Sequence, residues 1–145
     1  MQFIYTKALG KIRKMKSRIK VIQGGTSSSK TFSILAVLIN TAASESNQQI
    51  SVVSESLPHL KRGAIRDFLN IMKMTGRYID SHWNRTNFIY TFTNGSYIEF
   101  FGVEDADKLR GGRRTHLFAN EANRVSEEAY TCLLYTSDAA DDLTR

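Results

Sequence analysis

The chain has 145 residues, of which 41% are hydrophobic, and its formal net charge is +6. This length and composition predict one globular domain or part of one, and they exclude a linker or tail. No apolar run is long enough to cross a bilayer, and the N-terminus lacks the charged-then-apolar order of a signal peptide, so we expect a soluble, intracellular protein. The single cysteine, Cys132, rules out an internal disulfide and a multi-cysteine metal site.

Basic residues are concentrated near the N-terminus. From Lys7 to Lys20 the sequence KALGKIRKMKSRIK has many bases and no acid. Such a segment is typical of contact with an anionic partner, most often nucleic acid, and it is equally typical of a solvated basic face.

Strands and helices then alternate along the chain. The sequence predicts a short strand at Ile19–Gln23, a helix in KTFSILAVLINTAAS and a strand at Ile50–Ser54 that is buried on both faces. Apolar residues recur at every third or fourth position from Leu57 to Thr75, which indicates one amphipathic helix. This alternation predicts an α/β fold with a parallel sheet flanked by helices.

The period changes after this helix. The segment NFIYTFTNGSYIEFFG indicates two strands around an Asn94-Gly95 turn that permits positive φ at both positions. It predicts a β-hairpin, either inserted into the fold or forming an antiparallel edge. VEDADKLRGG then indicates a short helix or loop, and THLFAN indicates another apolar strand. Ser126 has the position of a helix N-cap, with Glu127 and Glu128 in the first turn.

The segment IQGGTSSSKT has the pattern of a phosphate-binding loop with one departure. In such a loop, glycines let amide N–H groups converge on phosphate oxygens, and the following helix adds its dipole. Ser29 replaces the second glycine of G-x-x-x-x-G-K-[ST], which requires a negative φ or about 1–3 kcal/mol of strain. The alternative is a serine-rich turn before a helix. The candidate nucleotide-binding residues of the loop are Gly24, Gly25, Thr26, Ser27, Ser28, Ser29, Lys30 and Thr31.

Two residues at the end of this loop have defined roles in the general pattern. The lysine, here Lys30, reaches the β- and γ-phosphates, and the hydroxyl after it, here that of Thr31, binds a magnesium ion. The predicted cofactors are therefore ATP and Mg²⁺.

The segment THLFANEA supplies a second candidate site. An ATPase of this class needs a carboxylate at the end of a neighbouring strand to polarise water, and an oxygen ligand beside it to hold magnesium through water. Glu121 would be the general base, and Asn120 would replace the usual aspartate as the ligand on the metal side. An amide oxygen lacks a negative charge, so it would hold the ion less firmly. The alternative, a plain helix N-terminus, is disfavoured because the loop lies upstream.

Together, VIQGGTSSSKTFSIL and GVEDADKLRGGRRTHLFANEAN resemble the ATPase domain of the terminase large subunit family, the motors that package DNA into tailed-phage heads. The resemblance covers roughly residues 18 to 131. Members often carry loops of the form G-G-x-x-S-[GS]-K-T and a second motif ending Asn-Glu-Ala-Asn, so the family tolerates both departures. The resemblance implies that Lys30 and Thr31 bind phosphates and magnesium, that Glu121 activates water and that Gln23 helps to recognise adenine.

The same resemblance implies an arginine that stabilises charge in the transition state. The loop contains none, so the candidates lie in KLRGGRRT: Arg110, Arg113 and Arg114. We take Arg110 as the catalytic one. The alternative for each is an ordinary surface charge.

For the intact protein, the resemblance implies double-stranded DNA, a portal and a terminase small subunit as partners. It also implies a homo-oligomeric ring in the cytoplasm of the infected bacterial host, with no membrane contact. Two alternative functions stay open. One is another P-loop motor of the helicase type, and the other is a nucleotide-binding module without hydrolysis, which Ser29 and Asn120 suggest.

The C-terminal segment CLLYTSDAADDLTR matches the translation of a transposon-based sequencing adapter. We therefore expect residues 1–131 to be part of a terminase-type ATPase domain that is incomplete at its C-terminus, and residues 132–145 to be a non-native tail. A genuine short acidic tail is the alternative. The coupling motif and nuclease domain of the family are not visible. Because an incomplete sheet leaves an unpaired edge, we expect the isolated fragment to be poorly soluble and inactive.

Overall fold

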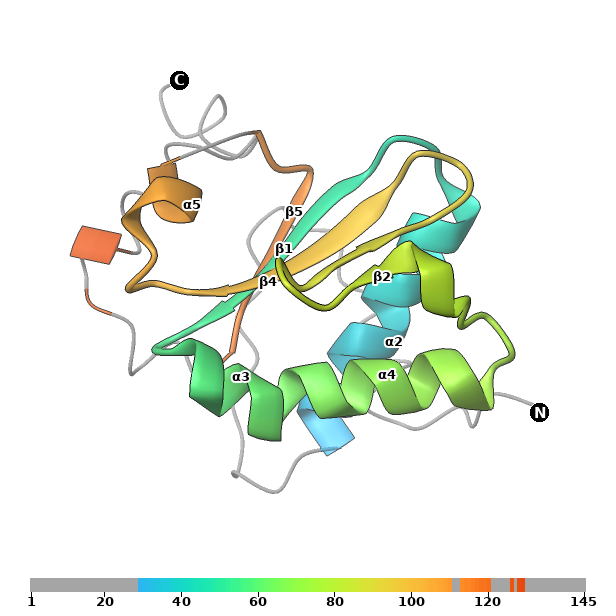
Figure 1. Ribbon diagram of the computed structural model, residues 1–145, viewed down its shortest axis with the longest axis horizontal. Coiled ribbons are helices and arrows are strands. Elements are labelled where there is room, and N and C mark those ends of the chain that lie inside the picture. Colours follow the sequence, from blue (N-terminus) through green and yellow to red (C-terminus); the bar gives the residue numbers. More distant parts are fainter. Residues whose placement is uncertain (1–28, 111–112, 121–125, 127, 130–145) are drawn as a thin grey trace.

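The computed structural model describes residues 29–110, 113–120, 126 and 128–129 (Figure 1). The strand expected at Ile19–Gln23 and the basic segment Lys7–Lys20 lie outside these residues. The described helices and strands are, in chain order, α2 (Ser29–Ser44), β1 (Gln49–Ser54), α3 (Leu57–Arg62), α4 (Ala64–Met74), the 3₁₀ helix η1 (Asp80–His82), β2 (Trp83–Asn84), β3 (Ile89–Thr91), β4 (Tyr97–Gly102), α5 (Ala106–Arg110) and β5 (His116–Ala119).

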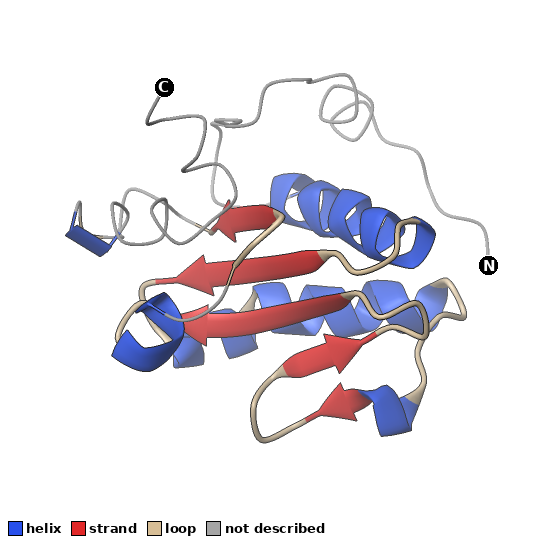
Figure 2. Cartoon of the chain, turned by 90° about the horizontal axis from the view of Figure 1, so that it is seen from above, coloured by secondary structure: helices blue, strands red, loops and turns tan. Residues whose placement is uncertain are grey.

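The strands form one mixed sheet in the order β2-β3-β4-β1-β5. Strand β1 pairs in parallel with β4 on one side and with β5 on the other. Strands β2 and β3 extend the sheet in antiparallel fashion beyond β4 (Figure 2). The predicted parallel sheet is therefore confirmed at its centre. The predicted hairpin is β3–β4, which carries the antiparallel edge of the sheet.

The main core lies between one face of the sheet and helices α2 and α4. Because side chains alternate along a strand, Ile50 and Val52 of β1 face this core while Ser51 and Val53 face the other side. The ring of Phe68 on α4 packs edge-on against Phe100, with ring centroids 5.1 Å apart. Figure 1 shows α2 and α4 on the same side of the sheet and α5 on the other. The α5 side has a smaller apolar cluster around Val53 and Phe101.

The helix expected over residues 57–75 is divided in two. Ser56 caps α3, since its Oγ accepts a hydrogen bond from the N–H of His59 at 3.4 Å. Gly63 then has φ −122° and ψ −91°, outside the helical range, and α4 begins at Ala64. Glycine is among the weakest helix formers, so one continuous helix was the wrong prediction at this residue. The apolar period nevertheless continues across the break, and Leu60 and Phe68 are both fully buried.

The hairpin turn differs from the predicted one. Gly95 has φ +90°, but Asn94 is not in the left-handed region, so positive φ at both positions was wrong. The side chain of Asn94 has a different task. Its Nδ2 donates to the carbonyl of Ala42 at 2.8 Å and lies 3.2 Å from that of Glu45. Carbonyls at a helix C-terminus have no intrahelical partner, so Asn94 ties the hairpin to the end of α2.

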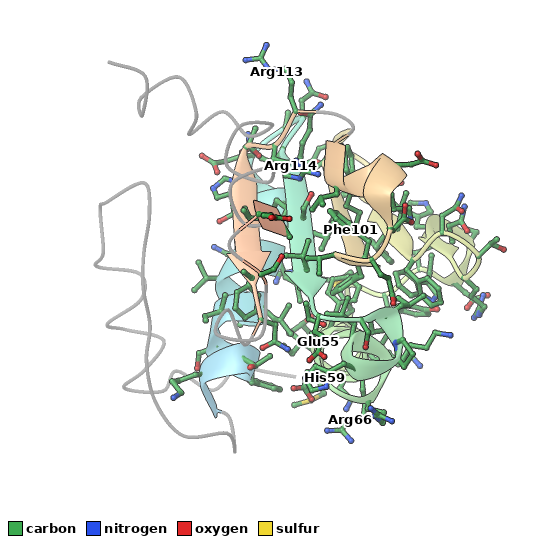
Figure 3. All side chains as sticks on the ribbon, turned by 90° about the vertical axis from the view of Figure 1, so that its left-hand side faces the viewer. Glu55, His59, Arg66, Phe101, Arg113 and Arg114 are labelled. Atoms are coloured by element: carbon green, nitrogen blue, oxygen red, sulfur yellow. The ribbon has the colours of Figure 1, made fainter. Side chains whose placement is uncertain are left out.

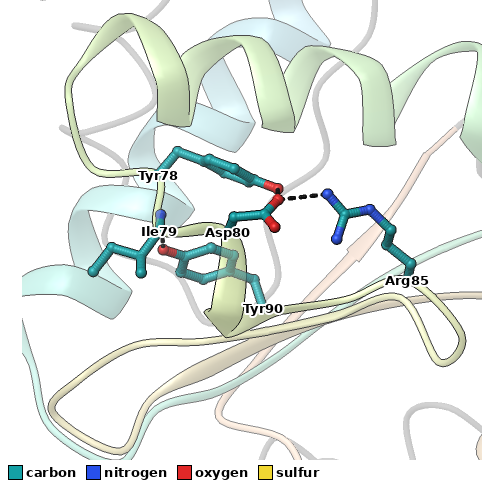
Figure 4. A network of polar contacts seen from close by, with 5 residues as sticks. All are labelled: Tyr78, Ile79, Asp80, Arg85 and Tyr90. Atoms are coloured by element: carbon teal, nitrogen blue, oxygen red, sulfur yellow. Dashed lines mark hydrogen bonds and ion pairs between the residues drawn. The ribbon is translucent and has the colours of Figure 1, made fainter.

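A polar cluster fixes η1 against the antiparallel edge (Figure 4). The hydroxyl of Tyr90 accepts a hydrogen bond from the N–H of Ile79 at 2.9 Å. One carboxylate oxygen of Asp80 accepts from the hydroxyl of Tyr78 at 2.9 Å and from the guanidinium of Arg85. The hydrogen bonds from Arg85 and Tyr78 lower the pKa of Asp80. No helix in the described part of the chain is long and apolar enough to span a membrane.

Candidate nucleotide-binding site

The described part of the predicted phosphate loop is its junction with α2. Ser29 is the first residue of that helix, and Lys30 and Thr31 follow in its first turn. A helical residue has negative φ, so the serine in place of the second glycine needs no left-handed backbone here. Residues 23–28 of the predicted site, from Gln23 to Ser28, lie outside the described residues. The side chains of Lys30 and Thr31 are both partly exposed.

Asn120 lies directly after β5 and extends its ladder. Its backbone N–H donates to the carbonyl of Val53 on β1 at 2.8 Å, which holds the residue at the end of the parallel pair. Its side chain is buried, and the residue is only 8% exposed. The hydroxyl of Thr31 donates to Oδ1 of Asn120 at 3.3 Å. The structure therefore brings together the two residues that the sequence suggested as oxygen ligands for magnesium.

This meeting point follows from the topology. Strands β1, β4 and β5 are parallel, so their carboxyl ends lie at the same edge of the sheet. The N-terminal turn of the 16-residue helix α2 reaches that edge, as the hydrogen bond from Thr31 to Asn120 requires. Ligands of open α/β sheets bind outside the carboxyl ends of the strands, and helix N-termini attract anions. The position therefore suits a phosphate group.

The paired oxygens also suit a magnesium ion in composition. Magnesium prefers oxygen ligands, keeps several waters and is held by one or two protein groups together with substrate phosphates. A hydroxyl from Thr31 and an amide oxygen from Asn120 are donors of that kind. Within the described residues there is no cluster of three His, Cys, Asp or Glu side chains that could hold a metal by itself. The donor set therefore fits an ion shared with a nucleotide.

The structure does not describe the side chains of the two predicted catalytic residues, Glu121 and Arg110. Glu121 follows Asn120 in the sequence and lies outside the described residues. Arg110 is the last residue of α5, but its side chain is outside the description. Both assignments stay predictions.

Arg114 was a candidate for the catalytic arginine, and in the structure its side chain lies inside the fold. It is only 1% exposed. Its Nε donates to Oγ of Ser51 at 3.0 Å, and its Nη2 donates to the carbonyl of Lys108 at 2.8 Å. Ser51 lies on the sheet face opposite to α2, so this guanidinium is occupied inside the fold. Figure 3 shows Arg114 against the sheet near Phe101, whereas Arg113 extends outward.

The buried contacts of Arg114 were missed at the sequence level, although a weak signal existed. Ser51 and Glu99 are polar residues with an apolar neighbour on each side in the strands QISVVS and YIEFFG. A polar side chain in a buried strand needs a hydrogen-bond partner. The sequence could thus have indicated a polar contact at these positions, but it did not show which distant residue completes it.

The family of the chain is established by comparison with known proteins. The model of the family described as phage terminase large subunit matches residues 16–142. The chain belongs to the phage terminase large subunit family. This membership favours a terminase over another P-loop motor of the helicase type. No curated protein sequence matches the chain.

Solved structures with the same fold come from the large terminase of a thermophilic bacteriophage. The match to crystal form 3 has a TM-score of 0.69 at 15% identity. It spans 92% of the chain described here and 35% of the phage chain. The match to crystal form 2 has a TM-score of 0.66 at 17% identity and spans 79% of the chain described here and 30% of the phage chain. The match to the complex with ATP-γ-S has a TM-score of 0.60 at 18% identity and spans 75% of the chain described here and 27% of the phage chain. The chain thus spans about a third of the phage enzyme, and the predicted fold class is confirmed.

Proposed function

We propose that this chain is the ATP-hydrolysing part of a phage DNA-packaging motor. The observation that carries the proposal is the hydrogen bond from Thr31 to Asn120 at 3.3 Å, which joins the first turn of α2 to the end of β5. A phosphate loop and a second site must meet at this edge of the sheet for hydrolysis. Support also comes from the large terminase of the thermophilic bacteriophage, which has been solved in complex with ATP-γ-S and with ADP.

In this proposal the triphosphate lies at the N-terminus of α2. The amides of the loop from Gly24 to Ser29 surround the phosphate oxygens, and the helix dipole favours their negative charge. Lys30 reaches the β- and γ-phosphates from the first turn. Gln23 contacts the adenine end of the nucleotide. Each of these contacts orients ATP so that its terminal phosphate faces β5.

Thr31 and Asn120 would hold Mg²⁺ together with the phosphates, Asn120 through a water molecule. When bound, the ion neutralises charge on the phosphate oxygens. Glu121 accepts a hydrogen bond from the attacking water and aligns it with the γ-phosphate. Arg110 stabilises the charge that develops on the transferred phosphoryl group, in a neighbouring copy of the chain.

The proposal extends to the intact protein. Residues 1–131 form part of the ATPase domain. The intact large subunit assembles as a ring on a portal, with a terminase small subunit, and moves double-stranded DNA in the cytoplasm of the infected bacterial host. The basic segment Lys7–Lys20 is a candidate contact for DNA or for a neighbouring subunit.

A pair of variants of the intact large subunit tests the chemistry. Glu121→Gln keeps the shape of the side chain but removes the base, so ATP binding is retained and turnover is lost. Lys30→Ala loses ATP binding, because the cation on the phosphates is removed. Full hydrolysis by the Glu121→Gln variant would refute the assignment of the base. Binding of ATP without hydrolysis by the unaltered protein would instead identify a nucleotide-binding module.

A further inference from the structure

Arg114 is a buried cation that the proposed chemistry does not use. Its exposed fraction is 1%, and burial of a charge is costly unless the charge is paired or hydrogen-bonded. The guanidinium also lies over the ring of Phe101, 5.5 Å from the ring centroid, in the geometry of a cation–π contact. These contacts let the guanidinium hold neighbouring groups of the fold in place.

The first contact of Arg114 is with β1, at the centre of the sheet. Its Nε donates to Oγ of Ser51 on β1 at 3.0 Å. The same hydroxyl donates to Oε1 of Glu99 on β4 at 2.7 Å, and Ser51 and Glu99 are register partners in the parallel pair. The hydroxyl of Ser51 therefore accepts from a cation and donates to an anion. This alignment connects the guanidinium to two neighbouring strands.

The second contact is with the end of α5. Nη2 of Arg114 donates to the carbonyl of Lys108 at 2.8 Å. The last carbonyls of a helix have no intrahelical partner, and a cation at this end is favoured by the helix dipole. Arg114 thus caps α5 at its C-terminus. Leu109 of the same helix packs on the apolar cluster around Val53 and Phe101.

The position of Arg114 in the chain connects two parts of the proposed site. Arg110 ends α5, two residues beyond Lys108. On the other side, the N–H of Thr115 donates to the carbonyl of Gln49 at 2.8 Å, and β5 then leads to Asn120. Arg114 stands at the junction between the helix that carries the proposed catalytic arginine and the strand that ends at the proposed metal ligand.

We propose that Arg114 is a positioning residue for Arg110. By holding the last turn of α5 on the sheet, it fixes the position of the backbone that carries Arg110. This inference rests on the proposed function, in which Arg110 acts on a nucleotide bound by a neighbouring copy. A displacement of a catalytic group by about 1 Å is enough to slow a reaction by roughly a hundredfold.

Lysine is not an equivalent at this position. The guanidinium directs Nε and Nη2 in one plane toward two acceptors, Oγ of Ser51 and the carbonyl of Lys108, while its face covers Phe101. A lysine has one nitrogen and no planar face. Arg114→Lys therefore keeps the charge but loses at least one of the two contacts. It separates the effect of charge from the effect of geometry.

The test compares Arg114→Met and Arg114→Lys with Arg66→Met in the full-length large subunit. Arg66 is an exposed arginine on α4 that forms a loose ion pair with Asp67 at 3.9 Å. We expect kcat for ATP hydrolysis to fall roughly tenfold to hundredfold in both Arg114 variants, with ATP affinity and Arg66→Met unchanged. A kcat in the Arg114 variants equal to that of Arg66→Met would overturn the proposal.

Hydrogen exchange supplies a readout that is independent of activity. The N–H of Leu109 donates to the carbonyl of Asp105 at 3.0 Å, so its exchange reports on α5, and the amides of β1 serve as an internal reference. In Arg114→Met we expect α5 amides to exchange about tenfold faster, the effect of losing one hydrogen bond, with β1 unchanged. Unchanged exchange in α5 would overturn the proposal. Should the unaltered protein lack ATPase activity, the proposed function fails and this measurement still decides whether Arg114 holds α5.

Ser51→Ala keeps the test decisive if Arg114→Met does not fold. It removes the hydroxyl between Arg114 and Glu99 and leaves both charges in place. We expect the same faster exchange in α5 and a smaller fall in kcat. A Ser51→Ala variant with unaltered exchange in α5 would count against the proposal.

Discussion

The hydroxyl of Thr31 donates a hydrogen bond to the side-chain oxygen of Asn120 across 3.3 Å, and this contact joins helix α2 to strand β5. Neither side chain carries a charge. The two oxygens therefore offer a divalent cation ligands without a compensating negative charge. A carboxylate at either position would change the affinity for the ion.

Replacement of Asn120 by aspartate should strengthen magnesium binding in the intact large subunit. The added negative charge interacts with the ion through its bound water. We expect the Mg²⁺ concentration for half-maximal ATPase activity to fall by roughly tenfold, the usual lower limit for changes around a bound metal. Asn120→Leu, which removes the oxygen, should raise that concentration. Equal magnesium dependence in all three proteins would show that Asn120 does not contact the hydrated ion.

Replacement of Asn94 by alanine should destabilise the chain. Its Nδ2 donates to the carbonyl of Ala42, and without it the C-terminal carbonyls of α2 lose their partner. We expect the free energy of unfolding to fall by about 1–3 kcal/mol, as measured by urea denaturation. Thr93→Ala changes an exposed neighbour in the same turn and should alter stability by less than about 0.5 kcal/mol. A similar loss in both variants would mean that the turn itself, and not the cap, carries the effect.

Replacement of Phe68 by alanine should be the most destabilising of these changes. The ring is fully buried and packs against Trp83, Tyr90 and Phe100. Loss of the ring leaves a cavity between α4 and the sheet, at a cost of about 3–5 kcal/mol in thermal or urea unfolding. Ile79, which is 45% exposed, provides the control, since Ile79→Ala leaves no cavity. A loss below about 1 kcal/mol for Phe68→Ala would contradict the packing described for α4.

Asp80 should titrate below its ordinary pKa of 3.8. Hydrogen bonds from Arg85 and then Tyr78 favour its carboxylate form. A pKa that is lower in the folded state contributes stability above the ordinary pKa, and that stability is lost as the pH falls through the folded value. NMR titration of Asp80 should therefore show a pKa below 3.8 that moves upward in Arg85→Gln. An identical titration of Asp80 in the unaltered protein and in Arg85→Gln would exclude the hydrogen bond between Arg85 and Asp80 in solution.

The central sheet and the position of Asn120 at its edge were largely predictable from the sequence, because each depends on local patterns. The β-branched run at Ile50–Ser54 indicated a strand buried on both faces, and β1 has that position. The candidate ligand Asn120 was predicted from its place after an apolar strand. Ser126 was predicted to cap a helix, and its Oγ accepts from the N–H of Ala129 at 3.2 Å.

The features that the sequence did not reveal depend on partners far along the chain. Asn94 favoured a left-handed turn by residue type, but its side chain donates to the carbonyl of Ala42 in α2 and to that of Glu45 just after α2, 52 and 49 positions away. Arg114 suggested a surface charge or a catalytic group, but its Nε contacts Ser51, 63 positions away. Local propensity does not predict such pairings, because they form only when the sheet is assembled.

The contact between Thr31 and Asn120 also bears on how the protein is made. These residues are 89 positions apart, and they meet only after β5 has joined β1. Closure of so long a loop is entropically costly until the strand pairing compensates for it. A chain still attached to the ribosome therefore cannot form this contact before residue 120 has left the exit tunnel. The proposed nucleotide site is complete only when the last strand of the described sheet has paired with β1.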